Sequence, residues 1–348
     1  MTKARLPETM TGVAMKIQEV AKRANVSVAT VSRTLNNDPR VNPATAQRVW
    51  LAVQELKYVP NFQARSLVSG KSRLMGLIVS DITNPFFPEL VKGFEDVAVE
   101  HGYDMIVAST GYDQTRMAVC VRRMIERKVD AVAIMTSEME PALTEQLERR
   151  SLPIVFLDVG LPGRSVSNVK VNYLGGVRCA VQHLLDLGHK EIAFISGPEH
   201  LKSAQVRRNA FLQCLGEGGI AEDPSYIEQG DHKVEGGLQA MSRLLRLTPR
   251  PTAVLASNDL TAIGALRSIH RAGLRVPDDI SIIGFDDILL AQFTDPPLST
   301  VRLSRTEIAR CSFDALLASI NGQHGGDEIL VETSLVVRES TSKAAVGV

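Results

Sequence analysis

The chain of 348 residues has few cysteines, and none of them is paired at a metal-binding or redox spacing. Cys120, Cys179, Cys214 and Cys311 lie far apart, and neither Cys-x-x-Cys nor His-x-x-x-His occurs. The sequence therefore indicates no metal site and no disulfide framework, and we expect four reduced thiols in the core.

Long apolar runs are also missing. No run reaches the roughly 18 residues that a membrane span needs, and the first 16 residues hold no apolar block of signal-peptide length. We therefore expect a cytoplasmic protein, associated with the nucleoid if it binds DNA.

Enzyme motifs are absent at the spacings that their chemistry requires. Gly70-Lys71-Ser72 is similar to the end of a phosphate-binding loop, but Arg65 stands where that loop needs a glycine. No Gly-x-Gly-x-x-Gly follows an apolar run, and no Gly-x-Ser-x-Gly or His-Glu-x-x-His occurs. We expect a protein that is not an enzyme and has no cofactor, with His189 as a structural turn residue.

A net charge of zero hides an uneven distribution. Residues 1–73 hold 12 Lys and Arg against 4 Asp and Glu, a net charge of +8, whereas residues 74–348 carry −8. Clustered cations are typical of a segment that contacts phosphates, although a solvated basic surface is the simpler interpretation of charge alone.

Residues 15–60 have the dimensions of a helix-turn-helix domain. Apolar residues from Ile17 to Ala24 recur at helical spacing, Ser27 can cap a second helix over 28–35, and Pro43 opens a third, after Asn42. The third helix places Val49, Trp50, Val53 and Leu56 on one face. Small three-helix adaptor domains share this pattern, and the basic charge favours DNA. The residues of the second helix that we expect to contact DNA are Ser27, Val28, Ala29, Thr30, Ser32, Arg33 and Asn36.

Residues 61–73 predict either a linker or one more short helix. A helix of about two turns is unstable in isolation, so it would need DNA or a partner to fold.

The body, residues 74–348, alternates apolar runs with amphipathic stretches. A first parallel sheet is predicted by the apolar runs at 74–80, 104–109, 130–135 and 153–158, the last of which we expect to be its final strand. A second sheet is predicted by the runs at 191–196, 252–257 and 280–285. We expect an α/β body of two lobes with a ligand between the carboxyl ends of the strands. Asn84, Phe86 and Phe87 follow the first run, where they suit a sugar-like ligand, unless the rings belong to the core.

Residues 16–72 resemble throughout the DNA-binding head of the lactose/galactose repressor (LacI/GalR) family, and SDITNPFF, RRNAF, SNDLTAIGAL and GFDD resemble its effector-binding body. The resemblance implies a body similar to periplasmic sugar-binding proteins. It also implies a hinge helix at Asn61–Val68 that folds on DNA, with Leu67 wedged into the minor groove. The hinge residues that it implies at the DNA are Asn61, Ala64, Arg65 and Leu67.

The resemblance also implies that Asp158, Arg207, Asn258 and Asp286 contact the effector. Their chemistry suits this role because carboxylates and a guanidinium hydrogen-bond to vicinal hydroxyls. An ion pair between the lobes is the alternative for the three charged residues, and a helix cap is the alternative for Asn258.

This chain departs from the family pattern at several positions. Val171 stands where many members have Asp, and Ala210 where Gly is usual, so the identity of the effector stays open. The only tryptophan, Trp50, lies in the head, which leaves Phe86, Phe87 or Phe293 to stack on a sugar. Residues 1–14 extend beyond the usual family start: either Met15 is the true start, or the extension is an arm near DNA.

The function implied is that of a homodimeric transcriptional regulator, a repressor, that binds a near-palindromic operator and is controlled by a small carbohydrate or related metabolite. A purine-like or phosphorylated effector, an activating role, and a carbohydrate transport protein are the alternatives. The basic head and the missing signal peptide argue against transport.

Overall fold

The computed structural model describes residues 17–35, 38–59, 71–136, 141–158, 162–163, 165–323 and 326–344. The chain divides into two units, residues 1–72 and residues 73–348, here called the head and the body. In the described ranges, no helix is both long enough and apolar enough to cross a membrane.

In its described residues the head contains three helices, α1 (Ile17–Ala24), α2 (Val28–Leu35) and α3 (Pro43–Glu55), as the sequence predicts. Local polar contacts start two of them. The Thr30 N–H donates to Ser27 Oγ at 3.1 Å, and the Ala44 N–H donates to Asn42 Oδ1 at 2.9 Å. In the turn before α2, Asn25 has a φ of +52°, a left-handed conformation that Asn tolerates better than most residues.

The core of the head is small and is built where the helices cross. Ala21 and Ala24 of α1 are buried there, and they leave room for Val31 of α2 and Val49 of α3. Trp50 is exposed, so the prediction that it shares the inner face of α3 is wrong, because the neighbouring Val49 takes that position.

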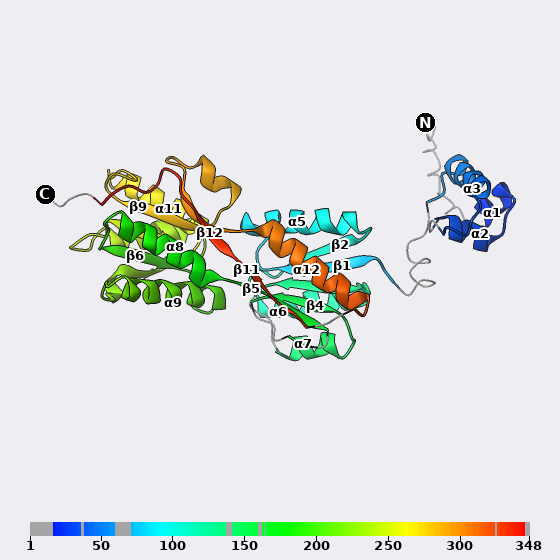
Figure 1. Cartoon of the computed structure of the whole chain (residues 1–348), viewed down its shortest axis with the longest axis horizontal. Coiled ribbons are helices and arrows are strands. Elements are labelled where there is room, and N and C mark those ends of the chain that lie inside the picture. The colour runs from blue at the N-terminus through cyan, green and yellow to red at the C-terminus, as the bar shows by residue number, and fades with distance from the viewer. Residues whose placement is uncertain are drawn as a thin grey trace, which may run out of the picture. The chain divides into compact units, whose positions relative to one another are not determined.

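In its described residues the body contains two six-stranded sheets flanked by helices. Figure 1 shows the two lobes side by side, with the chain running from one to the other between β11 and β12. The order of the first sheet is β11-β5-β4-β3-β1-β2, all parallel, and that of the second is β12-β10-β9-β8-β6-β7, in which only β12 is antiparallel to its neighbour. The elements of the first lobe are β1 (Leu74–Val79), α5 (Phe86–Glu100), β2 (Asp104–Ser109), α6 (Gln114–Glu126), β3 (Ala131–Met135), α7 (Pro141–Glu148), β4 (Ile154–Leu157), β5 (Val166–Val171), α12 (Arg305–Ile320) and β11 (Glu328–Val331). Those of the second are α8 (Tyr173–Asp186), β6 (Ile192–Ser196), α9 (Lys202–Glu217), η1 (Pro224–Tyr226), β7 (Ile227–Gln229), α10 (Val234–Leu244), β8 (Ala253–Ala256), α11 (Asp259–Arg271), β9 (Ser281–Asp286), η2 (Leu289–Phe293), β10 (Ser299–Leu303) and β12 (Thr333–Val336).

The α/β fold class with two lobes is confirmed, but the prediction that the first sheet ends at 153–158 is wrong. β5 and β11 extend that sheet, and α12 packs on α5 of the same lobe. Among the elements that the structure describes, the chain therefore crosses between the lobes three times, between β5 and α8, between β10 and α12, and between β11 and β12. An open parallel sheet adds strands at its edge from any part of the chain, so the order of apolar runs did not reveal these returns.

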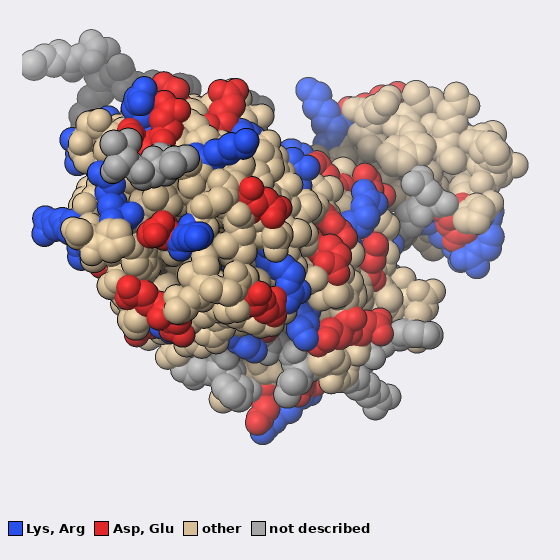
Figure 2. All heavy atoms as spheres, turned by 60° about the vertical axis from the view of Figure 1, so that its left-hand side comes forward, with Lys and Arg blue, Asp and Glu red and all other residues tan. Residues whose placement is uncertain are grey.

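The cysteines follow the prediction only in part. Cys120 and Cys214 are buried and Cys311 is half-buried, whereas Cys179 is exposed on α8. All four are free thiols. The acidic and basic side chains of the body are interspersed over the face that Figure 2 shows, rather than gathered by sign.

Candidate functional site

The outer face of α2 is the first candidate site. Ser27, Val28, Ala29 and Arg33 are exposed, and Thr30 and Ser32 are half-buried. Val31 and Thr34 face the core instead, which leaves the six side chains on the outer surface of the head. Asn36, Asn61, Ala64, Arg65 and Leu67 lie outside the described residues, as does the expected hinge helix.

A cavity in the body is the second candidate site. It contains about 660 Å³ of space, including the part open to solvent, and residues of both lobes line it. The strands of both sheets point their carboxyl ends at it: Asp158 directly follows β4, and Asp286 ends β9. The structure brings all seven predicted effector residues to this cavity, namely Asn84, Phe86, Phe87, Asp158, Arg207, Asn258 and Asp286.

Arg207 is the buried cation of the cavity. Its guanidinium lies 3.5 Å from Asp286 Oδ1 and 4.2 Å from the centroid of the Phe285 ring, and it donates to the carbonyl of Ser257. Arg207 Nε is buried and has no hydrogen-bond partner among the described residues. Because burying an N–H without a partner costs free energy, this atom provides an unused donor in a site lined by acceptors.

The partner of Arg207 contradicts the alternative of an ion pair between the lobes. Arg207 and Asp286 both belong to the second lobe, on α9 and β9. Burial raises the pKa of the Asp286 carboxyl from 3.8 to about 6, although the positive charge of Arg207 opposes this rise. Burial opposes the ionised form of Arg207 as well and is the largest single influence on it, but Asp286, Tyr173 and Asp158 together outweigh it, so the pKa of Arg207 is raised.

Asp158 connects the lobes through hydrogen bonds rather than through an ion pair. Its Oδ1 accepts the Val171 N–H at 2.8 Å, and its Oδ2 accepts the Tyr173 hydroxyl at 2.7 Å. Burial raises the pKa of Asp158, and these two hydrogen bonds act in the opposite direction. Tyr173 opens α8 in the second lobe, so this contact joins the two walls of the cavity at the first crossing.

Asn258 caps α11, as its alternative interpretation proposes. Its Oδ1 accepts the Thr261 N–H at 2.9 Å, and its Nδ2 donates to the carbonyl of His232 at 3.0 Å. His232 also lines the cavity, and burial lowers its pKa from 6.5 to about 3, so its imidazole is neutral near pH 7. The side chain of Asn258 therefore lines the cavity and also holds two parts of its wall together.

The aromatic wall belongs to the core and to the cavity at the same time. Phe86 and Phe87 are buried with their rings edge to face at 5.3 Å, and both line the cavity. Asn84 Oδ1 accepts the Phe86 N–H at 3.1 Å, which fixes the start of α5. Phe293 is 73% exposed and does not line the cavity, so the suggestion that it stacks on a bound sugar is wrong.

Sequence reasoning missed several cavity residues. Ser80 and Thr136 directly follow β1 and β3, so the rule that ligands bind at strand ends would have found them. No signal in the sequence marks three further cavity residues, which follow strands whose ends carry no recognisable motif: Tyr112, Tyr173 and His232. Within the described residues, no cluster of three His, Cys, Asp or Glu side chains is arranged to hold a metal ion.

Comparisons with known proteins relate the two sites to one family. Residues 16–61 match the model of bacterial regulatory proteins of the lacI family, and residues 181–341 match that of a periplasmic binding protein-like domain. The chain is 37% identical to the HTH-type transcriptional repressor CytR of Escherichia coli (strain K12) over 340 residues, 97% of this chain and 98% of the relative.

Solved structures agree with that match. A lac repressor dimer bound to operator and the anti-inducer ONPF has a TM-score of 0.84 and 29% identity, covering 94% of this chain and 99% of the repressor chain. A complex of the transcriptional regulator CelR with cellobiose has a TM-score of 0.70 and 30% identity, with coverage of 94% and 99%.

Proposed function

Because the chain belongs to the LacI family of bacterial regulatory proteins, we propose that its body binds a small neutral carbohydrate or related metabolite that sets the affinity of its head for an operator. The chain is a DNA-binding transcriptional regulator and not an enzyme. The sign that we propose is repression, in line with the names of its relatives. Such a regulator acts in the cytoplasm, at the nucleoid.

The observation that carries the ligand proposal is the pair of Arg207 and Asp286 in the cavity. The guanidinium keeps one unused N–H, and the carboxylate beside it accepts hydrogen bonds. Two neighbouring hydroxyls of a sugar offer one acceptor and one donor to this pair. A ligand without them would leave buried polar groups unpaired, which is the basis for rejecting analogues.

The charges of the cavity favour a neutral ligand over a phosphorylated one. Among the described lining residues, Asp158 and Asp286 are acidic, and Arg207 is the one Lys or Arg. Arg207 already faces Asp286, and His232 is neutral near pH 7. A phosphate would therefore approach two carboxylates with no cation left to neutralise it.

A planar nitrogen heterocycle is the second candidate ligand. The rings of Phe86, Phe87, Tyr112 and Tyr173 all line the cavity, and flat ligands stack on such faces. The same wall suits the apolar face of a sugar ring.

The proposed domain organisation assigns DNA binding to residues 15–60, the hinge to 61–73, and effector binding and dimerisation to 74–348. The exposed face of α2 enters the major groove, where Val28 and Ala29 contact base edges and Arg33 contacts phosphate. Asn36 and the hinge residues Asn61, Ala64, Arg65 and Leu67 complete the proposed interface.

We propose a homodimer, which matches the two-fold symmetry of a near-palindromic operator. The body has an exposed apolar cluster on η2, where Leu289, Leu290 and Phe293 are 58%, 47% and 73% exposed. Large apolar side chains gathered on one short turn are typical of an interface.

Isothermal titration calorimetry of the full-length protein tests the ligand proposal. The panel contains D-ribose, D-galactose, cellobiose, adenosine, hypoxanthine and ribose 5-phosphate. We expect a neutral sugar to bind, and Asp286→Asn to weaken binding by about 10- to 100-fold, the loss of a hydrogen bond to a charged group. The exposed Asp186→Asn variant is the control and should bind like wild type. Binding of ribose 5-phosphate in preference to every neutral ligand would overturn the proposal.

A further inference from the structure

Residues 286–289 form a tight corner between β9 and η2. Asp286 and Asp287 have φ values of +109° and +55°, a left-handed conformation that is costly for residues other than glycine. Such backbone persists only where surrounding contacts fix it. The corner matters to the cavity because the side chain of Asp286 lines it.

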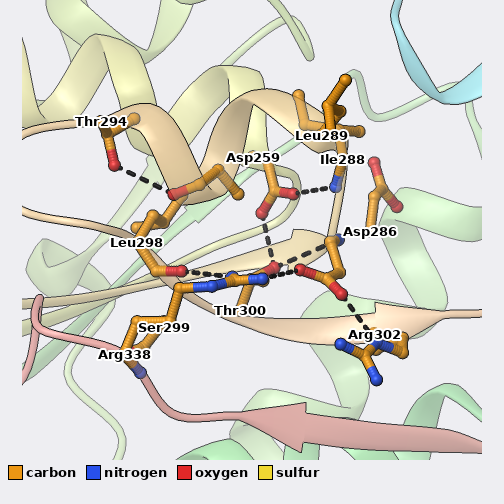
Figure 3. A network of polar contacts seen from close by, with 12 residues as sticks. Asp259, Asp286, Ile288, Leu289, Thr294, Leu298, Ser299, Thr300, Arg302 and Arg338 are labelled. Atoms are coloured by element: carbon orange, nitrogen blue, oxygen red, sulfur yellow. Dashed lines mark hydrogen bonds and ion pairs between the residues drawn. The ribbon is translucent and has the colours of Figure 1, made fainter.

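Side chains of the second lobe hold the corner from one side (Figure 3). Asp259 Oδ2 accepts the Ile288 N–H at 2.8 Å, and Arg302 and Arg338 bind the two carboxylate oxygens of Asp287 at 2.7 and 2.6 Å. These contacts lie within one lobe, so a movement of one lobe relative to the other leaves them intact.

The first lobe holds the corner from the other side through Arg305 and Glu89. Arg305 opens α12 and donates to the carbonyl of Asp286 and, at 2.8 Å, to that of Asp287. The same guanidinium lies 2.7 Å from Glu89 Oε2 on α5, and Glu89 Oε1 accepts the Leu289 N–H at 3.0 Å. The Glu89 carboxylate therefore binds Arg305 of its own lobe and, at the same time, a backbone N–H of the second lobe.

We propose that Glu89 and Arg305 form an interlobe latch that positions Asp286 for the ligand and links this position to the arrangement of the two lobes seen in this structure. Neither residue lines the cavity, so both act as positioning residues. This inference rests on the proposed function in one respect, that Asp286 contacts the ligand.

The latch follows from where its partners are anchored. Glu89 is fixed to α5 in the first lobe, and Leu289 is fixed to η2 in the second. A rotation of the lobes that separates these elements breaks the contact between Glu89 and Leu289 and leaves Arg305 with fewer partners. The side chains of Arg305 and Glu89 are only 16% and 30% exposed, so solvent screens their ion pair less than a surface pair.

Hydrogen–deuterium exchange of the full-length, ligand-free protein tests the latch without any assumption about the ligand. The variants are Glu89→Ala, which removes both contacts, and Glu89→Gln, which keeps an acceptor for Leu289 but removes the charge. Asp96→Ala is the matched control, because Asp96 lies on the same helix and its ion pair with Lys92 is exposed.

We expect Glu89→Ala to speed exchange in peptides covering 286–293 by about 10-fold or more, and Glu89→Gln to have a smaller effect. Peptides of β6, in the core of the second lobe, should exchange as in wild type, as should every peptide of the second lobe in Asp96→Ala. Unchanged exchange at 286–293 in Glu89→Ala would overturn the latch, and so would an equal rise throughout the second lobe, which indicates general destabilisation.

Calorimetry with cellobiose and D-ribose then separates this inference from the proposed function. If either sugar binds wild type, Glu89→Ala should weaken it several-fold, and unchanged affinity would overturn the positioning of Asp286. If neither sugar binds wild type, the proposal that these sugars are ligands is wrong. The exchange rate at 286–293 in Glu89→Ala then decides whether the latch exists.

Discussion

The hydroxyl of Tyr173 donates to Asp158 Oδ2 at 2.7 Å and thereby joins the start of α8 in the second lobe to the end of β4 in the first. The same tyrosine ring lies 4.9 Å from the Arg207 guanidinium. Asp158 is therefore connected to the buried cation of the opposite lobe through one aromatic side chain.

Removing this hydroxyl should destabilise the protein. Tyr173→Phe leaves a partly buried carboxylate oxygen without its partner, which costs about 1–3 kcal/mol of unfolding free energy. Tyr226→Phe is the matched control, because its hydroxyl bonds a carbonyl at an exposed site. Urea denaturation followed by circular dichroism measures both variants. Equal losses for the two variants would show that the hydrogen bond between Tyr173 and Asp158 contributes no more than an exposed one.

The stability contributed by Asp286 should fall as the pH rises. Its carboxyl has a pKa of about 6 in the folded protein against 3.8 as reference, so the folded state binds this proton more tightly. This contribution is fully present below pH 3.8 and is lost as the pH rises through about 6. The unfolding free energy of wild type minus that of Asp286→Asn should therefore decline by about 3 kcal/mol, mostly between pH 4 and 7. A difference that grows with pH would contradict the burial of this group.

The exposed cluster on η2 should hold the proposed dimer together. Phe293→Asp places a charge where an apolar contact is expected, so the protein should become monomeric at micromolar concentration. Sedimentation velocity measures the change. Val337→Asp changes an exposed apolar residue outside η2; it is the control and should remain dimeric. A Phe293→Asp variant that remains dimeric would contradict the proposal that η2 forms the dimer interface.

The hinge should contribute to operator binding but not to ligand binding. Leu67→Ala removes the side chain proposed to enter the minor groove, so the free energy of operator binding should become less favourable by a few kcal/mol. Fluorescence anisotropy on a symmetric operator with a central CG step measures the loss of operator affinity. The affinity for the sugar that binds wild type, measured by calorimetry, should be unchanged. A parallel loss of ligand affinity would indicate misfolding instead.

The sequence predicted those parts of the structure that depend on local signals. Ser27, Asn42 and Pro43 marked the helices of the head, and alternating runs marked the strands. The seven cavity residues came largely from a family resemblance, and their meeting at one cavity reflects the carboxyl ends of parallel strands.

The remaining features depend on contacts between distant segments. Glu89 and Arg305 lie 216 positions apart and meet because α12 returns to the first lobe, a return that no local pattern encodes. Tyr173 acquires its role from the crossing between β5 and α8. Phe293 was wrongly assigned because an aromatic ring close to a motif does not reveal which way its short helix faces.

We propose that the ligand in the body and the operator at the head affect each other's binding. The most direct test is fluorescence anisotropy of the full-length protein on an operator selected from a random library, with and without the sugar that binds in calorimetry, together with the reverse titration of sugar with and without operator. We expect the sugar to change operator affinity and the operator to change sugar affinity by the same factor, because coupling free energies are reciprocal. A sugar that occupies the cavity and leaves operator affinity unchanged would contradict this proposal.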